Sequence, residues 1–189
     1  SEGQNDGQYD GLGETWSIPV MGNVQTDTLA NPDRIDQWLA FFGGGYGCTS
    51  LGEGPYLFAI RLEDGSIYHR AQVTSSPTAP LSNNAIVAMP TLYNPHQEDV
   101  SDNKDYATRV YAGDLQGNIW KLVTVDANPN NWTFEKFAEL GLDEPITAAV
   151  TVLPDINNQQ VYVMAGTGGD LRVDSMGKIF KFATFVDTD

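Results

Sequence analysis

The sequence is poor in the residues that build most enzymatic and metal sites. Its 189 residues include one cysteine, Cys48, and two histidines, His69 and His96. A single cysteine excludes a disulfide within the chain and a zinc site made of several thiolates. Cys48 is either a small buried apolar residue or the partner of a cysteine outside the chain, and the sequence leaves both readings open. The histidines lie far apart, and no serine stands in a nucleophile-elbow pattern, so nothing here predicts a catalytic centre.

Positive charge and long apolar stretches are also scarce. The chain has ten Lys and Arg residues and 25 Asp and Glu residues, which gives a formal net charge of −15 at pH 7. A surface of that sign repels a phosphate backbone, so we expect no nucleic-acid partner. The longest apolar runs, residues 38–42 and 146–153, are far shorter than the roughly 20 residues that cross a bilayer. We therefore expect no membrane-spanning segment, and the residues after Ser1 do not resemble a signal peptide.

What the chain does contain is many short runs of aromatic and β-branched residues, separated by clusters that include its 19 glycines and 10 prolines. This pattern predicts an all-β fold with almost no helix. A glycine-marked strand end followed by a short aromatic strand recurs three times. Taking Phe58, Trp120 and Phe180 as equivalent gives spacings of 62 residues (58 to 120) and 60 residues (120 to 180). A strand repeat that regular predicts a β-propeller.

The repeat divides residues 1–189 into a single propeller segment of about three blades, each expected to be a four-stranded antiparallel sheet. The approximate blades are residues 11–75, 83–140 and 143–186. Their first strands are expected at 15–21, 85–93 and 145–152, and the third blade is expected to reach 178–182 with too few residues left for a fourth strand. Propellers typically have about four to eight blades. We therefore expect a partial ring from a larger propeller, with association through its exposed blade edges.

One polar insertion carries a candidate metal site. Residues 96–105 supply four carboxylates and three neutral side-chain oxygens, and oxygen atoms are the ligands from which Ca²⁺ collects about six to eight. The regular Asp-x-Asp-x-Asp-Gly pattern of a dedicated calcium loop is absent, and Lys104 places a positive charge inside the segment. A calcium site and an ordinary solvated loop both remain open, and the excess of carboxylates fits either calcium binding or solubility alone.

The residues also resemble a known family. Its most specific part is the run Gly113-Asp114-Leu115-Gln116-Gly117-Asn118-Ile119-Trp120-Lys121. Further matching segments, in the same order along the chain, are residues 11–20, 42–46, 109–112, 144–149 and 165–168. Together they resemble the propeller domain of PilY1-type proteins, the tip-associated adhesins and assembly factors of bacterial type IV pili. The resemblance covers nearly the whole chain and implies a propeller larger than three blades.

The resemblance also bears on calcium. Many members carry a calcium loop just before the strand that matches 109–113, and the loop ends in an aspartate where this chain has Thr108. The first and fifth ligand positions of that loop fall on Val100 and Lys104, and only Asp102 is in register. The calcium loop of the family is therefore not carried over to this chain as it stands, and a rearranged Ca²⁺ site that uses Asp99, Asp102 and Asp105 stays open beside an ordinary solvated loop.

Three functional hypotheses follow. The resemblance implies a non-enzymatic, extracellular module at the pilus tip, exported through the periplasm, that acts in pilus biogenesis and in adhesion to a host or abiotic surface. Its partners would be pilin-like proteins or the rest of the parent propeller. The alternative is a fragment of a pyrroloquinoline-quinone dehydrogenase propeller, because residues 57–65 resemble a blade strand and turn of that family. The third is a purely structural segment whose neighbouring blades carry the activity.

Overall fold

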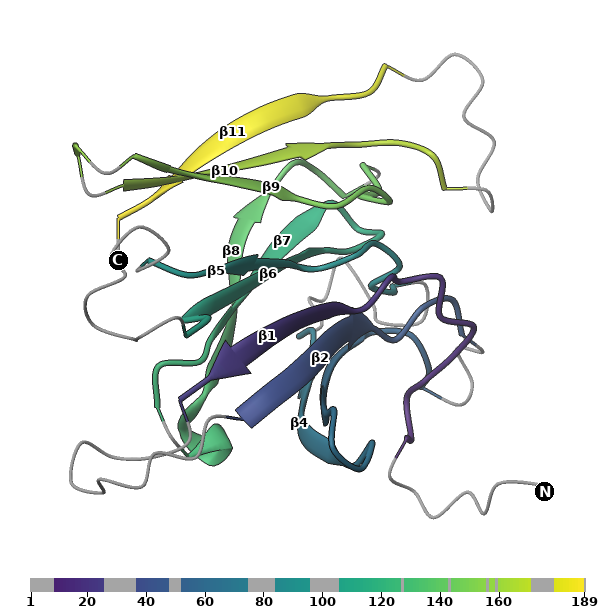
Figure 1. Cartoon of the computed structure of the whole chain (residues 1–189). Coiled ribbons are helices and arrows are strands. Elements are labelled where there is room, and N and C mark those ends of the chain that lie inside the picture. The colour runs from purple at the N-terminus through teal and green to yellow at the C-terminus, as the bar shows by residue number, and fades with distance from the viewer. Residues whose placement is uncertain are drawn as a thin grey trace.

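The chain folds into three antiparallel β-sheets that lie one after another (Figure 1). The structure is a computed structural model, and it describes residues 9–25, 37–47, 52–74, 84–95, 106–126, 128–142, 144–155, 157–158, 160–170 and 179–188. Within these residues the only helical element is one short 3-10 helix, η3 (Pro129–Asn131). The predicted all-β fold is therefore confirmed.

Each sheet is a meander in which neighbouring strands in sequence are hydrogen-bonded neighbours. The first sheet contains β1 (Val20–Val24), β2 (Gln37–Gly43), β3 (Tyr56–Arg61) and β4 (Ile67–Gln72). The second contains β5 (Thr91–Tyr93), β6 (Arg109–Gly113), β7 (Asn118–Val123) and β8 (Thr133–Glu139). The third has three strands, β9 (Thr151–Asp155), β10 (Gln160–Gly166) and β11 (Phe182–Asp187), so β11 is an edge strand.

Two separate cores hold the three sheets together. Between the first and second sheets, Phe41 and Leu57 pack with Trp120 and Leu122. Between the second and third sheets, side chains such as Tyr111 and Ile119 pack with valines of β10. Because side chains alternate between the two faces of a strand, the second sheet contributes one face to each core. The sheets are thus stacked as successive layers, as blades of a propeller are.

The β3–β4 hairpin follows its sequence signal. Gly65 has a φ of 74°, a conformation that costs glycine little and other residues more. Its N–H donates to the Arg61 carbonyl, and Asp64 Oδ1 accepts from the Ser66 N–H at 2.8 Å. The Asp-Gly turn predicted here is confirmed.

The first strand of each sheet begins later than predicted, at Val20, Thr91 and Thr151. We call the residues just before these strands, 13–18, 84–89 and 144–149, the lead-in segments. They are not strands of the sheets, because their backbone groups bond to loops. Leu115 N–H, for example, donates to the Ala85 carbonyl, and Ile86 N–H donates to the Gly54 carbonyl of the first sheet. A short run of apolar residues, such as 85–89, does not by itself distinguish such a crossing segment from a strand.

The predicted equivalence of Phe180 with Phe58 and Trp120 is wrong. Phe58 pairs with Phe42, and Trp120 pairs with Ala112, in each case one residue before the glycine that ends the second strand. In the third sheet that position, Ala165, pairs with Ala183. Phe180 precedes β11 and is 44% exposed. The third repeat is therefore offset by three residues, 183 in place of 180, because the β10–β11 connection is longer than the aromatic spacing indicates.

Candidate functional site

Glycine-rich loops from all three sheets meet at one end of the stack. The loops follow β2, β6 and β10, and the lead-in segments cross them there. Gly45 N–H donates to the Ile86 carbonyl, Ile146 N–H donates to the Asp114 carbonyl, and Gly168 N–H donates to the Pro145 carbonyl. Tyr46 of the first sheet reaches the buried Asp170 after β10, with its hydroxyl 3.5 Å from Oδ1. This end is therefore the place where the three sheets present one continuous loop surface.

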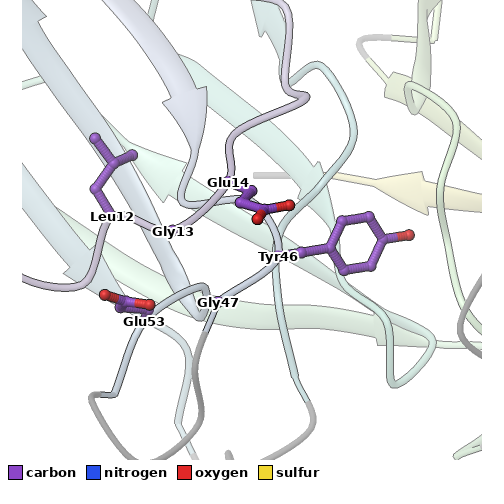
Figure 2. A pocket seen from close by; sticks show the side chains of 6 residues that line it. All are labelled: Leu12, Gly13, Glu14, Tyr46, Gly47 and Glu53. Atoms are coloured by element: carbon purple, nitrogen blue, oxygen red, sulfur yellow. The ribbon is translucent and has the colours of Figure 1, made fainter.

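A hollow of about 530 Å³ opens on this loop surface (Figure 2). The residues that line it are Leu12, Gly13, Glu14, Tyr46, Gly47 and Glu53. Figure 2 shows Glu14 beside Tyr46, whereas Glu53 lies apart from both across the Gly13 and Gly47 backbone. The two carboxylates do not converge on a common point, and among the described residues no group of three His, Cys, Asp or Glu side chains is placed to hold a metal. The hollow can offer hydrogen-bond acceptors and an aromatic ring to a ligand, but its lining contains no nucleophile paired with a base.

The most specific sequence motif has a structural role. Asp114 is fully buried in the β6–β7 turn, and its carboxylate accepts five hydrogen bonds. The donors are Asn84 Nδ2 at 2.9 Å, Gln116 N at 2.9 Å, Asn118 N and Nδ2 at 2.9 Å each, and Trp120 Nε1 at 2.7 Å. A buried carboxylate is tolerated when its lone pairs are satisfied in this way. Asp114 therefore fixes the turn, the core tryptophan and the lead-in segment of the second sheet together.

A second buried carboxylate joins the second and third sheets. Asp187, at the end of β11, is 2% exposed. Its carboxylate lies 3.5 Å from Lys121 Nζ and 3.6 Å from Arg109 Nη1, and it accepts a hydrogen bond from the Tyr111 hydroxyl. Burial, reinforced by the hydrogen bond to Asp187, raises the pKa of Tyr111 well above its usual value. The tyrosine therefore stays a neutral donor, which fits a structural contact rather than acid–base chemistry.

The described histidine is packed rather than exposed. His69 in β4 lies against Trp132, with ring centroids 5.2 Å apart, and Tyr68 packs on the same indole at 5.6 Å. Burial lowers the pKa of His69 below its usual value, because the charged imidazolium loses hydration there. The ring joins the first sheet to the second, and no described acid or nucleophile is paired with it for catalysis.

This packing gives a pH prediction. The folded-state pKa of His69 lies below the unfolded-state value of about 6.5, so the unfolded chain binds the proton more readily. The free energy of unfolding is therefore unaffected by His69 well above pH 6.5, falls as the pH drops through 6.5 toward the folded-state pKa, and is constant below it. Urea unfolding at about pH 7.5 and 5.5 measures this loss. We expect a smaller loss for His69→Gln, and an identical loss in both proteins would contradict the assignment.

The predicted calcium residues Asp99, Asp102 and Asp105 lie outside the described residues, as do His96 and Cys48. Calcium binding therefore stays a prediction. Among the residues that the structure describes, no helix is long and apolar enough to cross a membrane.

The two outer faces of the stack expose large apolar side chains. On and before the first sheet these are Trp16, Ile18, Met21 and Trp38, which are 53–73% exposed. On the third sheet Leu153 is 55% exposed, Phe182 74% and Val186 45%. Large exposed apolar side chains gathered on one face are typical of an interaction surface. The sequence predicted that the end blades of a partial ring are exposed. Which residues lie on the exposed faces was known only once the structure gave the strand register.

No protein-family model matches the chain. Among the curated proteins that match it, two cover half or more of the chain. The chain is 33% identical over 94 residues, half of its length, to the type IV pilus biogenesis factor PilY1 of Pseudomonas aeruginosa PAO1. It is 27% identical over 149 residues, 79% of its length, to a PilY1 homolog of Xylella fastidiosa.

A solved structure decides the fold. The crystal structure of the Pseudomonas aeruginosa PilY1 C-terminal domain matches 86% of this chain with a TM-score of 0.62 and 21% sequence identity. The resemblance to PilY1-type proteins is confirmed. The chain spans 7% and 9% of the two curated relatives' length and 34% of the solved PilY1 chain. The three sheets thus correspond to part of a PilY1-type C-terminal β-propeller.

Proposed function

We propose that this chain is a section of the propeller of a PilY1-type protein and acts in type IV pilus biogenesis without catalysing a reaction. The curated proteins that it resembles are named type IV pilus biogenesis factors. The observation that carries the proposal is that the three-sheet arc, over 86% of the chain, has the fold of the PilY1 C-terminal domain. Two buried carboxylates with several partners each, Asp114 and Asp187, hold this arc together.

In this proposal the chain is exported through the periplasm and lies at the cell surface, at the pilus tip. Its loop surface, mounted on rigid sheets, would contact a host or abiotic surface. A pilin-like protein would pair with the exposed edge of β11, whose outer backbone groups have no neighbouring strand in the described sheet. Addition of an extended segment to such an edge is a common mode of peptide recognition.

Deletion of the coding region for residues 9–188 tests the function. We expect loss of surface pili and of pilus-dependent adhesion, restored by the wild-type gene and by a Thr133→Val variant that changes one exposed position of β8. Immunoblots against a segment outside the deletion check that the remaining protein accumulates. Normal piliation and adhesion with the truncated protein present would contradict the proposal.

Two further readings have distinct outcomes. A cofactor absorption band in the purified protein would support the quinoprotein dehydrogenase alternative. Replacement of the insertion from Glu98 to Asp105 separates a passive segment from an active one. Unchanged adhesion and assembly would indicate that the insertion has no role in recognition and that other parts of the protein carry it.

A further inference from the structure

Both interfaces between neighbouring sheets contain the same contact. Gly43 ends β2, and Gly113 ends β6. A Cβ atom added to Gly43 would lie 2.5 Å from Ile86 Cγ2, and one added to Gly113 would lie 2.7 Å from Ile146 Cβ. Real Cβ atoms do not approach other heavy atoms so closely. In each case an isoleucine from the lead-in segment of the next sheet, itself fully buried, occupies the space that the glycine leaves.

The third sheet has the same glycine without the isoleucine. Gly166 ends β10 as Gly43 ends β2. The nearest atoms to an added Cβ are Phe182 Cδ2 at 3.7 Å and the Lys181 carbonyl oxygen at 3.9 Å, both from its own sheet or the residue before it. No residue of another sheet, among those described, reaches this position. At Gly43 and Gly113 an isoleucine fills the space beside the glycine. Among the described residues, no isoleucine fills the corresponding space beside Gly166.

The surrounding face repeats the same comparison. Residues that alternate with Gly43 and Gly113 on their strands, such as Phe41 and Tyr111, are fully buried under the next sheet. The corresponding residues of β10, Tyr162 and Met164, are only half-buried. Their neighbours on this face by register include Leu153, Thr184 and Val186, of which the two apolar residues are about half exposed. This face is therefore built like the two covered ones, and no sheet among the described residues covers it.

The repeat indicates what kind of segment would cover the outward face of the third sheet. Ile86 and Ile146 each stand five residues before the first strand of their sheet, at Thr91 and Thr151. We propose that the outward face of the third sheet is the docking face for a further sheet of the same repeat, from the same polypeptide. Gly166 receives a β-branched side chain five residues before the first strand of that sheet. The inference rests on the proposed section of a larger propeller, and it agrees with the chain spanning 34% of the solved PilY1 chain.

Thiol labelling tests the docking. Thr184 is exposed on the outward face, where it pairs with Met164. Thr184→Cys, in a Cys48→Ser background, is made both in the isolated 189-residue chain and in the full-length gene product, and labelling of its peptide is followed by mass spectrometry. We expect labelling to be at least about tenfold slower in the full-length protein, because a docked sheet must open first. Thr133→Cys, on the exposed face of β8, is the control and should label equally in both proteins.

Gly166→Val then tests the contact itself. We expect it to restore fast labelling in the full-length protein while leaving the circular dichroism and melting temperature of the isolated chain unchanged. Gly113→Val, whose new side chain overlaps Ile146, should destabilise the isolated chain. Equal labelling in both proteins, slow labelling that persists with Gly166→Val, or unfolding of the isolated chain by Gly166→Val would each overturn the proposal. So would protection in the isolated chain that disappears on dilution, since the occupant would then be a second copy.

A reading frame that encodes no further repeat would also overturn the proposal. Failure of the proposed function is a separate result. Normal piliation after the deletion would contradict a role in pilus biogenesis, whereas the labelling rates report only on sheet packing in the purified protein.

Discussion

Asp114→Ala is expected to lower the free energy of unfolding by about 3–5 kcal/mol, among the largest effects of any single substitution in this chain. The substitution removes the acceptor for five hydrogen bonds. The Trp120 indole N–H and the Asn84 amide are buried with their residues, and a buried donor left without an acceptor costs about 1–3 kcal/mol. Water can reach some of the backbone donors of the turn, which keeps the total below the sum of five such costs.

Urea unfolding followed by tryptophan fluorescence measures this loss. Asp126→Ala is the matched control, because Asp126 also caps a turn, through Asn128 N at 2.7 Å and Asn131 Nδ2 at 3.0 Å, but does so at the surface. We expect a far smaller loss for the control. Asp114→Asn should lie between the two, since an amide keeps one acceptor oxygen and turns two donors toward the others. A loss with Asp114→Ala no larger than the control's would contradict the structural role of the motif.

Asp187→Ala is expected to cost about 3 kcal/mol, because it removes the buried carboxylate beside the Lys121 ammonium, whereas Glu135, 3.3 Å from the same ammonium, is 57% exposed and screened by solvent. The Lys121 and Asp187 side chains are 3% and 2% exposed, and their atoms lie 3.5 Å apart. Arg109 and the Tyr111 hydroxyl lose the same carboxylate. Because these partners lie on β6 and β7 and Asp187 lies on β11, the loss should loosen the third sheet from the second.

Glu139→Ala is the control for this prediction. Its ion pair with Lys136 is shorter, 2.6 Å, but both side chains are about half exposed. Solvent screens such a pair, so we expect almost no loss of stability despite the shorter distance. Hydrogen exchange should locate the effect of Asp187→Ala in β10 and β11 rather than in the first sheet. Equal losses for Asp187→Ala and Glu139→Ala would show that burial does not decide the strength of these pairs.

The architecture was predictable from the sequence because glycines mark the strand ends. Gly43, Gly113 and Gly166 end the second strand of each sheet, as the repeat indicated. The starts of the first strands were not predictable. The apolar run of residues 85–90 predicts a strand. In the structure the backbone of Ile86 instead forms hydrogen bonds with loop residues, and its side chain packs on Gly43 of the preceding sheet. Such a tertiary contact overrides the local pattern.

The functional residues were predictable only in part. The sequence singled out the Gly-Asp-Leu-Gln-Gly-Asn-Ile-Trp run, but the bonding of Asp114 to Asn84 joins residues 30 positions apart. Asp187 and Lys121 are separated by 66 positions, and no spacing rule connects them. The pairing of each glycine with an isoleucine of the next sheet was missed as well. The five-residue spacing that Ile86 and Ile146 share is counted from the starts of the strands that follow them, and these starts were known only from the structure.

The structure of the full-length gene product, by crystallography or electron cryomicroscopy, tests the central claim most directly. The claim is that β1–β11 form consecutive blades of a larger PilY1-type ring. We predict that the three sheets adjoin further blades around one axis, with Tyr162, Met164 and Gly166 buried under the next sheet. A structure in which the outward face of the third sheet is bathed in solvent, or in which the sheets do not follow one another around a ring, would contradict it.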